Sequence, residues 1–189
     1  EWSVSLDGNA KAVALSSGTA FVAETNTNRL TAVDVSSESE IWSVSLDGDG
    51  RGVAVSDGTV FVTEGEGGKA LTAVDISSQS ESWSVSLDGF GNDVAVSDGT
   101  AFVAEGFEGQ ALTAVDISSQ SETWSVSMGR AQGVDVSGGT AFVAEGKSLT
   151  AVDISSQSES WSVSLDGDGN DVAVNDGTAF VAVGPDGKS

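Results

Sequence analysis

The sequence predicts an all-β fold, a β-propeller of about five four-stranded blades. The first observation is a period of about 40 residues, which is typical of propeller blades. The second is that each period contains four short segments with the composition of β-strands. The third is that no stretch of the chain has a helical pattern. Five tryptophans mark the period with steps of 40, 41, 41 and 37 residues, at Trp2, Trp42, Trp83, Trp124 and Trp161.

The four strands of a unit are illustrated by Val53–Val55, Ala101–Glu105, Leu112–Ile117 and Trp83–Leu87. Turn residues such as Asp-Gly and Ser-Ser separate them. The segment Trp83–Leu87 alternates large apolar residues with serines, so its tryptophan is expected in the core, as are the four other tryptophans. A β-helical solenoid is the main structural alternative, but four strands in each period favour the propeller.

The whole chain, residues 1–189, is predicted to be one propeller domain. Its repeats span approximately residues 9–48, 49–89, 90–129, 130–167 and 168–189, with one further strand within residues 1–7. We expect the last blade to be shared between the two termini, with Trp2–Leu6 completing the sheet that begins at Val172. That sheet would lack a third strand. The chain is then a fragment of a longer array, or the two edges pair directly, or a neighbouring molecule donates a strand.

The repeat resembles that of the LVIVD-repeat propellers. The residues that carry the resemblance are Asn92–Gly99, Ala101–Gly106 and Leu112–Ser118, and their equivalents recur in every unit. Phe replaces the usual aromatic Tyr, Thr-Ala stands inside the LVIVD core, and a Pro that often follows is absent. The resemblance implies a secreted or surface-attached propeller without assigned chemistry.

The chain is strongly acidic, with 7 Lys and Arg against 29 Asp and Glu and a net charge of −22. This charge argues against binding to nucleic acid or to anionic membranes. It also suggests a high-salt habitat, where carboxylates are screened, although an ordinary acidic secreted protein has the same composition. The chain contains no His and no Cys, which removes the commonest general base and the thiolate nucleophile. We therefore expect no catalytic residues and no enzymatic activity.

Two of the four loops of each unit vary in length or sequence, and two are constant. In an up-and-down meander alternate loops lie at the same end of the sheet, so the variable loops share one face. Binding residues usually lie in loops on a rigid scaffold, although drift after duplication would give the same variation. We predict that this face binds partners through Asp49, Arg51, Phe90, Phe107, Arg130, Asp168 and Asp171.

Three sets of acidic residues are candidate sites. The segment Asp166–Asp171 resembles a calcium loop, but no Glu stands twelve residues along, and plain Asp-Gly turns are favoured. The Asp that ends each third strand is expected to accept hydrogen bonds within its turn. A Glu recurs at the end of the second strand and could form a cation-attracting ring, although a solvated strand end is favoured. We expect no metal and no cofactor.

The predicted function is that of a non-enzymatic extracellular or cell-surface propeller, a structural or adhesive module that self-assembles into oligomers or filaments. The alternative is a receptor module that binds a ligand or protein through the variable-loop face. A hydrolase or lyase that uses carboxylates alone is the third class. The expected partners are proteins or copies of the chain itself, without nucleic acid or membrane insertion.

Overall fold

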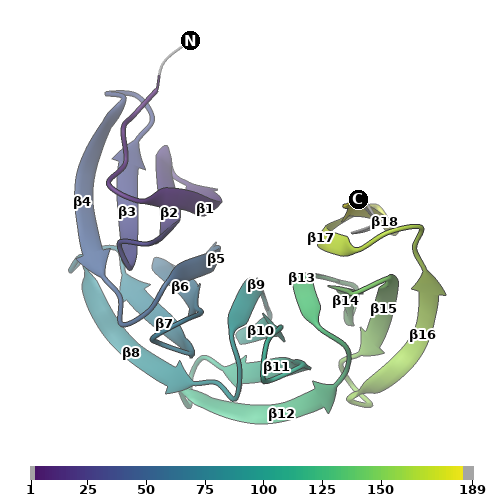
Figure 1. Ribbon diagram of the computed structural model, residues 1–189. Coiled ribbons are helices and arrows are strands. Elements are labelled where there is room, and N and C mark those ends of the chain that lie inside the picture. The colour runs from purple at the N-terminus through teal and green to yellow at the C-terminus, as the bar shows by residue number, and fades with distance from the viewer. Residues whose placement is uncertain (1–2, 185–189) are drawn as a thin grey trace. The chain divides into compact units, whose positions relative to one another are not determined.

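A computed structural model describes residues 3–184, in which every regular element is a β-strand (Figure 1). No helix in this part of the chain is long and apolar enough to cross a membrane. The chain divides into two compact units, residues 1–91 and residues 92–189. The all-β prediction is confirmed, and both units are built from antiparallel sheets of the propeller type.

Unit 1 contains two four-stranded meanders in which neighbouring strands are consecutive in the chain. The first sheet has strands β1 (Asn9–Ser16), β2 (Thr19–Thr25), β3 (Arg29–Asp34) and β4 (Ser39–Ser45). The second sheet has strands β5 (Gly50–Ser56), β6 (Thr59–Glu64), β7 (Ala70–Asp75) and β8 (Ser80–Ser86).

Unit 2 begins with two sheets of the same design and ends with a hairpin. The third sheet has strands β9 (Gly91–Ser97), β10 (Thr100–Glu105), β11 (Ala111–Asp116) and β12 (Ser121–Ser127). The fourth has strands β13 (Ala131–Ser137), β14 (Thr140–Glu145), β15 (Ser148–Asp153) and β16 (Ser158–Ser164). The hairpin consists of β17 (Gly169–Asn175) and β18 (Thr178–Val183).

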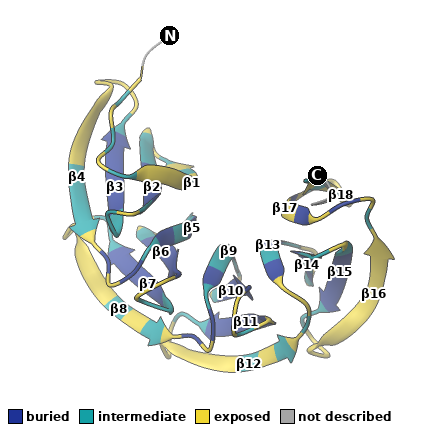
Figure 2. Cartoon of the chain, in the orientation of Figure 1, coloured by how far each residue is buried: buried dark blue, intermediate teal, exposed yellow. Residues whose placement is uncertain are grey.

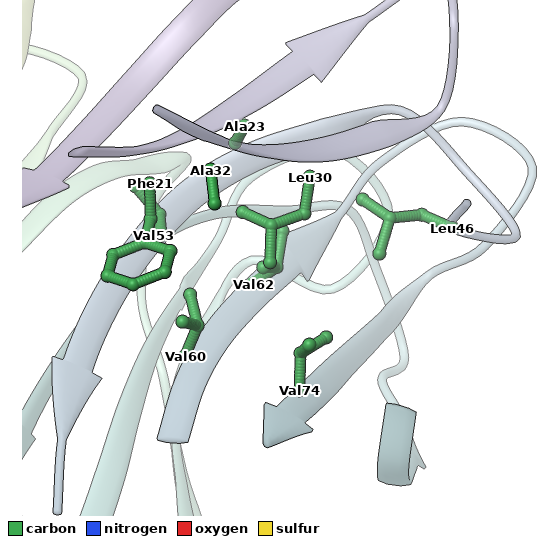
Figure 3. Packing of buried hydrophobic residues seen from close by; sticks show 9 residues of the cluster. All are labelled: Phe21, Ala23, Leu30, Ala32, Leu46, Val53, Val60, Val62 and Val74. Atoms are coloured by element: carbon green, nitrogen blue, oxygen red, sulfur yellow. The ribbon is translucent and has the colours of Figure 1, made fainter. Parts of the chain in front are cut away.

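The core of unit 1 lies between its two sheets. Phe21 and Leu30 of the first sheet pack against Val60, Val62 and Val74 of the second (Figure 3). The second and third strands are buried along most of their length, whereas the fourth strands are largely exposed (Figure 2). This face-to-face packing is possible because a large side chain such as Phe21 on one sheet fits against smaller aliphatic side chains on the facing sheet.

The tight turns between first and second strands contain residues with positive φ. In unit 1 these are Ser17 and Gly18, followed by Asp57 and Gly58. Two consecutive positive φ values are characteristic of the type I′ turn, which matches the twist of a two-stranded hairpin. This geometry explains why the turn between the first and second strands has the same length in every repeat.

The tryptophans of the fourth strands lie beside the phenylalanines of the second strands, with ring centroids 5.7 Å apart for Phe21 and Trp42. Trp42, Trp83 and Trp124 are half-buried, because their outer edges reach the solvent. Trp161 is 43% exposed, and the hairpin that follows it has the two strands β17 and β18 in residues 3–184. Trp2 lies outside the described residues.

The strand expected over Trp2–Leu6 is not formed in its described part. Residues 3–6 have no regular secondary structure, and β17 and β18 form a sheet of two strands in residues 3–184. Sharing of the last blade between the termini stays a prediction.

Candidate functional site

The two variable loops of a sheet lie together, as the alternation of loops predicts. In unit 1 the backbone N–H of Leu46, just after β4, donates to the carbonyl of Asn28 in the β2–β3 loop at 2.8 Å. In unit 2 Met128 donates in the same way to Gln110 at 2.9 Å. At the opposite end of the sheet the two constant loops are also hydrogen-bonded, for example by the backbone N–H of Val35, which donates to the carbonyl of Gly18 at 3.0 Å. Each sheet therefore has a variable end and a constant end.

At the variable end of unit 1, the predicted site residues contact the loops of the neighbouring repeat. The Asp49 carboxylate accepts a hydrogen bond from the backbone N–H of Asn26 at 2.9 Å. The guanidinium carbon of Arg51 lies 5.2 Å from the centre of the Phe90 ring, and the Lys69 ammonium lies 5.7 Å from it. Both distances fall within the range of cation–π attraction. These side chains hold adjacent repeats together.

At the variable end of unit 2, the third and fourth sheets are joined by side-chain contacts of the same kind. The side-chain amide of Asn92 donates to the carbonyl of Ala131 at 2.8 Å. The Asp93 carboxylate accepts from the backbone N–H of Val134 at 2.9 Å. Asp135 repeats this contact one sheet later, accepting from Val174 at 2.6 Å.

Between the fourth sheet and the β17–β18 hairpin, the variable end contains a pocket in place of such side-chain contacts. A pocket of about 310 Å³ lies there, lined by Arg130, Gln132, Gly146, Asp168, Gly169 and Asn170. Its floor is fixed by a backbone hydrogen bond from Gly169 to the carbonyl of Gly146 at 2.7 Å. The volume is at the lower end of the range for small-ligand sites. The pocket unites two predicted site residues, Arg130 and Asp168.

The two other predicted residues of unit 2 lie elsewhere. Phe107 is 55% exposed in the β10–β11 loop. Asp171 is exposed on β17, where its carboxylate accepts from the backbone N–H of Val172 at 2.8 Å. Neither lines the pocket.

The recurring glutamates of the second strands are buried, which corrects the expectation of solvated strand ends. Glu24, Glu64 and Glu105 are at most 1% exposed, and Glu145 is half-buried. Each accepts a hydrogen bond from the threonine of the adjacent third strand. In three sheets the second oxygen accepts from the backbone of the glycine that precedes the first strand, namely Gly8, Gly48 and Gly129. We call this arrangement the Glu–Thr–Gly clamp.

The clamp is a structural device within one sheet, because it ties the second and third strands to the loop that enters the same sheet. A buried carboxylate must be hydrogen-bonded to remain in the fold. Burial raises the pKa of Glu64, while the hydrogen bonds from Thr72 and Gly48 oppose the shift. The cation-attracting ring is therefore not formed in this way, since the carboxylate oxygens are already used by the chain.

Acid side chains do not gather into a metal site in residues 3–184. The Asp residues that end the third strands accept hydrogen bonds in their own turns, as predicted. Asp75, for instance, accepts from the hydroxyl of Ser77 at 2.6 Å and the backbone N–H of Ser78 at 2.7 Å. These bonds lower the pKa of Asp75. The calcium-like segment Asp166–Asp171 contributes two pocket-lining side chains, Asp168 and Asn170.

Sequence reasoning missed four of the pocket residues, namely Gln132, Gly146, Gly169 and Asn170. Gln132 and Asn170 stand at the position of Arg51 in their own repeats, so the variable-loop comparison contained a signal for them. It also missed the clamp, whose threonine recurs in every Leu-Thr-Ala-Val-Asp segment. The recurrence of this Glu and this Thr is visible in the sequence. Their contact depends on the register between the second and third strands, which the sequence does not give.

Comparisons with known proteins agree with this fold. The family described as outer membrane protein assembly factor BamB matches residues 1–106, 26–130 and 108–188. The curated proteins contain no match. Among solved structures, hydrazine synthase of Kuenenia stuttgartiensis is similar with a TM-score of 0.76 at 16% identity, over 86% of this chain. The chain spans about half of that one, 51% of its length, and the likeness shows the fold. Because the family matches cover almost every residue, the chain belongs to the family described as outer membrane protein assembly factor BamB.

Proposed function

We propose that this chain is a non-enzymatic, extracellular or cell-surface binding module that recognises a protein partner through the variable end of its sheets. The observation that carries the proposal is the pocket of about 310 Å³ beside the β17–β18 hairpin. At the other junctions the equivalent side chains contact neighbouring repeats, as Asp49 and Asn92 do. At this junction they line a hollow that a partner can enter.

The lining of the pocket indicates the chemistry of the partner group. It offers one cation from Arg130, one carboxylate from Asp168, and the amides of Gln132 and Asn170. Such a set can both donate and accept hydrogen bonds, so it suits a polar side chain with both capacities. A pocket of this volume takes one side chain of a partner protein. The family's description as an outer membrane protein assembly factor supports a protein partner.

The experiment is a selection from a displayed peptide library against the whole chain in molar salt. The counter-selection uses the double variant Arg130→Ala with Asn170→Ala. We expect peptides that bind the wild-type chain at least tenfold more tightly than the double variant. A matched control is Ser97→Ala at the constant end, which should leave affinity unchanged. Selected peptides that bind all three proteins equally would contradict the proposal.

A structural, self-assembling module is the second candidate, and the face of β1 favours it. Val13 is 61% exposed and Leu15 72% exposed, whereas Val53 at the same position as Val13 in the second sheet is 9% exposed. An apolar face of this kind marks an interaction site. Light scattering in molar salt would show oligomers that the variant Val13→Lys with Leu15→Lys abolishes. A monomer at all concentrations would exclude this candidate.

As an alternative to self-assembly through the face of β1, we propose a finer architecture, a closed ring of five blades of the LVIVD-repeat kind in which residues 3–6 complete the sheet of β17 and β18. The recurrence of the Trp-Ser-Val-Ser-Leu segment at the N-terminus supports it. With one strand position between them, the backbones of Ser5 and Ala182 would lie two strand spacings apart, about 10 Å. Spin labels at these two positions should report that separation plus the label lengths, and a much longer distance would exclude the ring.

A further inference from the structure

The variable end of the fourth sheet has a short loop between its second and third strands. This β14–β15 loop consists of residues 146–147, whereas the corresponding loops of the second and third sheets consist of residues 65–69 and 106–110. In the second sheet Glu66 of the longer loop accepts a hydrogen bond from the backbone N–H of Asp49 at 3.1 Å, so this loop lies on the loop that enters the sheet. The shorter loop of the fourth sheet leaves the entering loop more accessible, and this difference lies in the interior of the chain.

The glycine that follows the clamp glutamate shows that the short loop leaves open space. In the second sheet a side chain fills the space over this glycine, because a Cβ atom placed on Gly65 would collide with Arg51. A Cβ atom placed on the equivalent Gly146 would meet no atom beyond its chain neighbours within 4 Å. Gln132 stands at the position of Arg51 and lines the pocket instead. The hollow is thus a property of the fourth sheet's own loops.

The two variable-end loops of the fourth sheet carry positive charge. Arg130 lies in the loop that enters this sheet and Lys147 in its β14–β15 loop, and neither loop contains Asp or Glu. Both side chains belong to exposed residues. The corresponding loops of the second and third sheets have more acids than cations, with Asp47, Asp49, Glu66, Lys69, Asp88 and Glu108. The fourth sheet therefore presents a local positive charge in a chain whose net charge is −22.

The constant end of unit 2 has the opposite character. Its turns in the described residues contain no Lys or Arg, and the acids in or beside these turns include Asp98, Asp116, Asp153 and Asp176. Charge distributions of this kind orient a charged partner before contact. An acidic partner is repelled from the constant end and attracted to the loops of Arg130 and Lys147.

We propose that the pocket binds one carboxylate side chain of an acidic partner protein. This inference rests on the function proposed above and adds the chemistry of the bound group. The planar guanidinium of Arg130 matches the two oxygens of a carboxylate, and the amides of Gln132 and Asn170 supply further donors. Lys147 adds positive charge in the adjoining loop. Asp168, on the hairpin side of the pocket, opposes negative charge, so the site favours a carboxylate over the more highly charged phosphate.

The test uses three displayed peptide libraries that share random flanking residues and carry Glu, Gln or Lys at one fixed central position. Each library is selected on the whole chain, and fluorescence anisotropy of labelled, selected peptides gives their affinities. We expect the Glu library to be enriched most strongly. Replacing the central Glu of a selected peptide by Gln should weaken binding at least about fivefold, because the charge-assisted pair with Arg130 is lost.

Three variants of the site identify the groups that select the carboxylate. Arg130→Gln should weaken binding of the Glu peptide at least about fivefold, and Asp168→Asn should tighten it about twofold, because the first removes an attraction and the second a repulsion. Arg130→Glu should reverse the preference, so that the Lys library is enriched instead. The matched control is Glu122→Gln on β12, which removes an exposed charge outside the pocket and should leave the affinity unchanged.

The outcomes separate this inference from the proposed function. Equal enrichment of the Gln or Lys library on the wild-type chain would overturn the inference, and the proposed function would stand if those peptides still required Arg130 and Asn170. An Arg130→Glu variant that keeps the preference for Glu would also overturn the inference. If no library yields peptides that distinguish the wild-type chain from the double variant Arg130→Ala with Asn170→Ala, both the inference and the proposed function fail.

Discussion

The hydroxyl of Thr72 donates to the carboxylate of Glu64 at 2.5 Å, and both side chains are fully buried between β6 and β7. The other carboxylate oxygen accepts from the backbone N–H of Gly48 at 2.6 Å. One side chain thereby connects two strands of its sheet and the loop that enters this sheet. Hydrogen bonds to a charged, buried acceptor are stronger than neutral ones.

Replacing this acceptor should destabilise unit 1 substantially. We expect Glu64→Gln to lower the free energy of unfolding by about 2–3 kcal/mol, because the amide can accept only one of the two hydrogen bonds. Urea denaturation followed by tryptophan fluorescence measures the change. The matched control is Glu145→Gln, at the half-buried clamp of the fourth sheet, where we expect a smaller loss. Equal losses at both positions would contradict a role for burial.

The stability of unit 2 should increase as the pH falls from about 7 towards 4. Burial raises the pKa of Asp93 to about 7, and the negative charges of Asp171 and Asp135 add to the shift, while hydrogen bonds from Val134 and Val94 oppose it. The folded chain therefore binds a proton that the unfolded chain does not bind between these pH values. Thermal melting across this range should show a falling midpoint with rising pH. In Asp93→Asn, which keeps an acceptor for Val134, this slope should be weaker and the midpoint at pH 8 higher by a few degrees.

Below pH 4 stability should fall as the pH falls, because of the aspartates in the turns after the third strands. The pKa of Asp34 is lowered to about 2 by hydrogen bonds from Ser36 and Ser37, and that of Asp75 is lowered by Ser77 and Ser78. Their stabilisation is present above the ordinary pKa of Asp and is lost as the pH falls through the folded value. Acid titration by circular dichroism should show this loss, and Asp75→Asn should reduce its steepness. An unchanged acid limb in that variant would argue against the turn as its origin.

Stability should rise with salt, because the net charge of −22 opposes the compact state. Arg29 forms ion pairs with Asp7 and Glu40, but the 7 Lys and Arg of the sequence are far too few to neutralise its 29 Asp and Glu. At about 1 M salt the Debye length is about 3 Å and their repulsion is screened. The melting midpoint should rise with NaCl and equally with NaClO₄ at low concentration, since screening depends on ionic strength. A midpoint that falls with both salts would contradict the prediction.

The phenylalanines of the second strands provide a test of packing between sheets. Phe61 is 1% exposed, whereas Phe180 at the same position in β18 is 59% exposed. Phe61→Ala should lower the free energy of unfolding by about 3–5 kcal/mol through lost burial and a cavity. Phe180→Ala should change it by less than 1 kcal/mol. Equilibrium denaturation of the two variants gives the comparison, and similar losses would mean that Phe180 is buried in solution.

Much of this fold follows from the sequence, because a strand alternates with period two and its turns have fixed chemistry. The Asp-Gly pairs between strands predicted turns, and the structure has a positive φ at Asp57 and Gly58. Two of the residues that line the pocket, Arg130 and Asp168, were named from the sequence because they stand in variable loops. Gln132 and Asn170 stand in the same variable segments, but that they line a pocket with Gly146 depends on how the hairpin packs beside the fourth sheet. The buried Glu64 was misjudged, because its partner Thr72 is distant in sequence and is identified by register alone.

The Glu–Thr–Gly clamp is contained within one sheet and the loop that enters it, a stretch shorter than one period, and this has an evolutionary consequence. A gene segment of one period that is duplicated or deleted brings or removes a whole clamp, so the remaining repeats keep all of theirs. Unequal recombination between such similar segments can therefore change the number of repeats without leaving a buried carboxylate unpartnered. The loops at the variable end contact the next repeat instead, so each such event creates a new junction there. Length variation and new binding surfaces would then arise in the same genetic step.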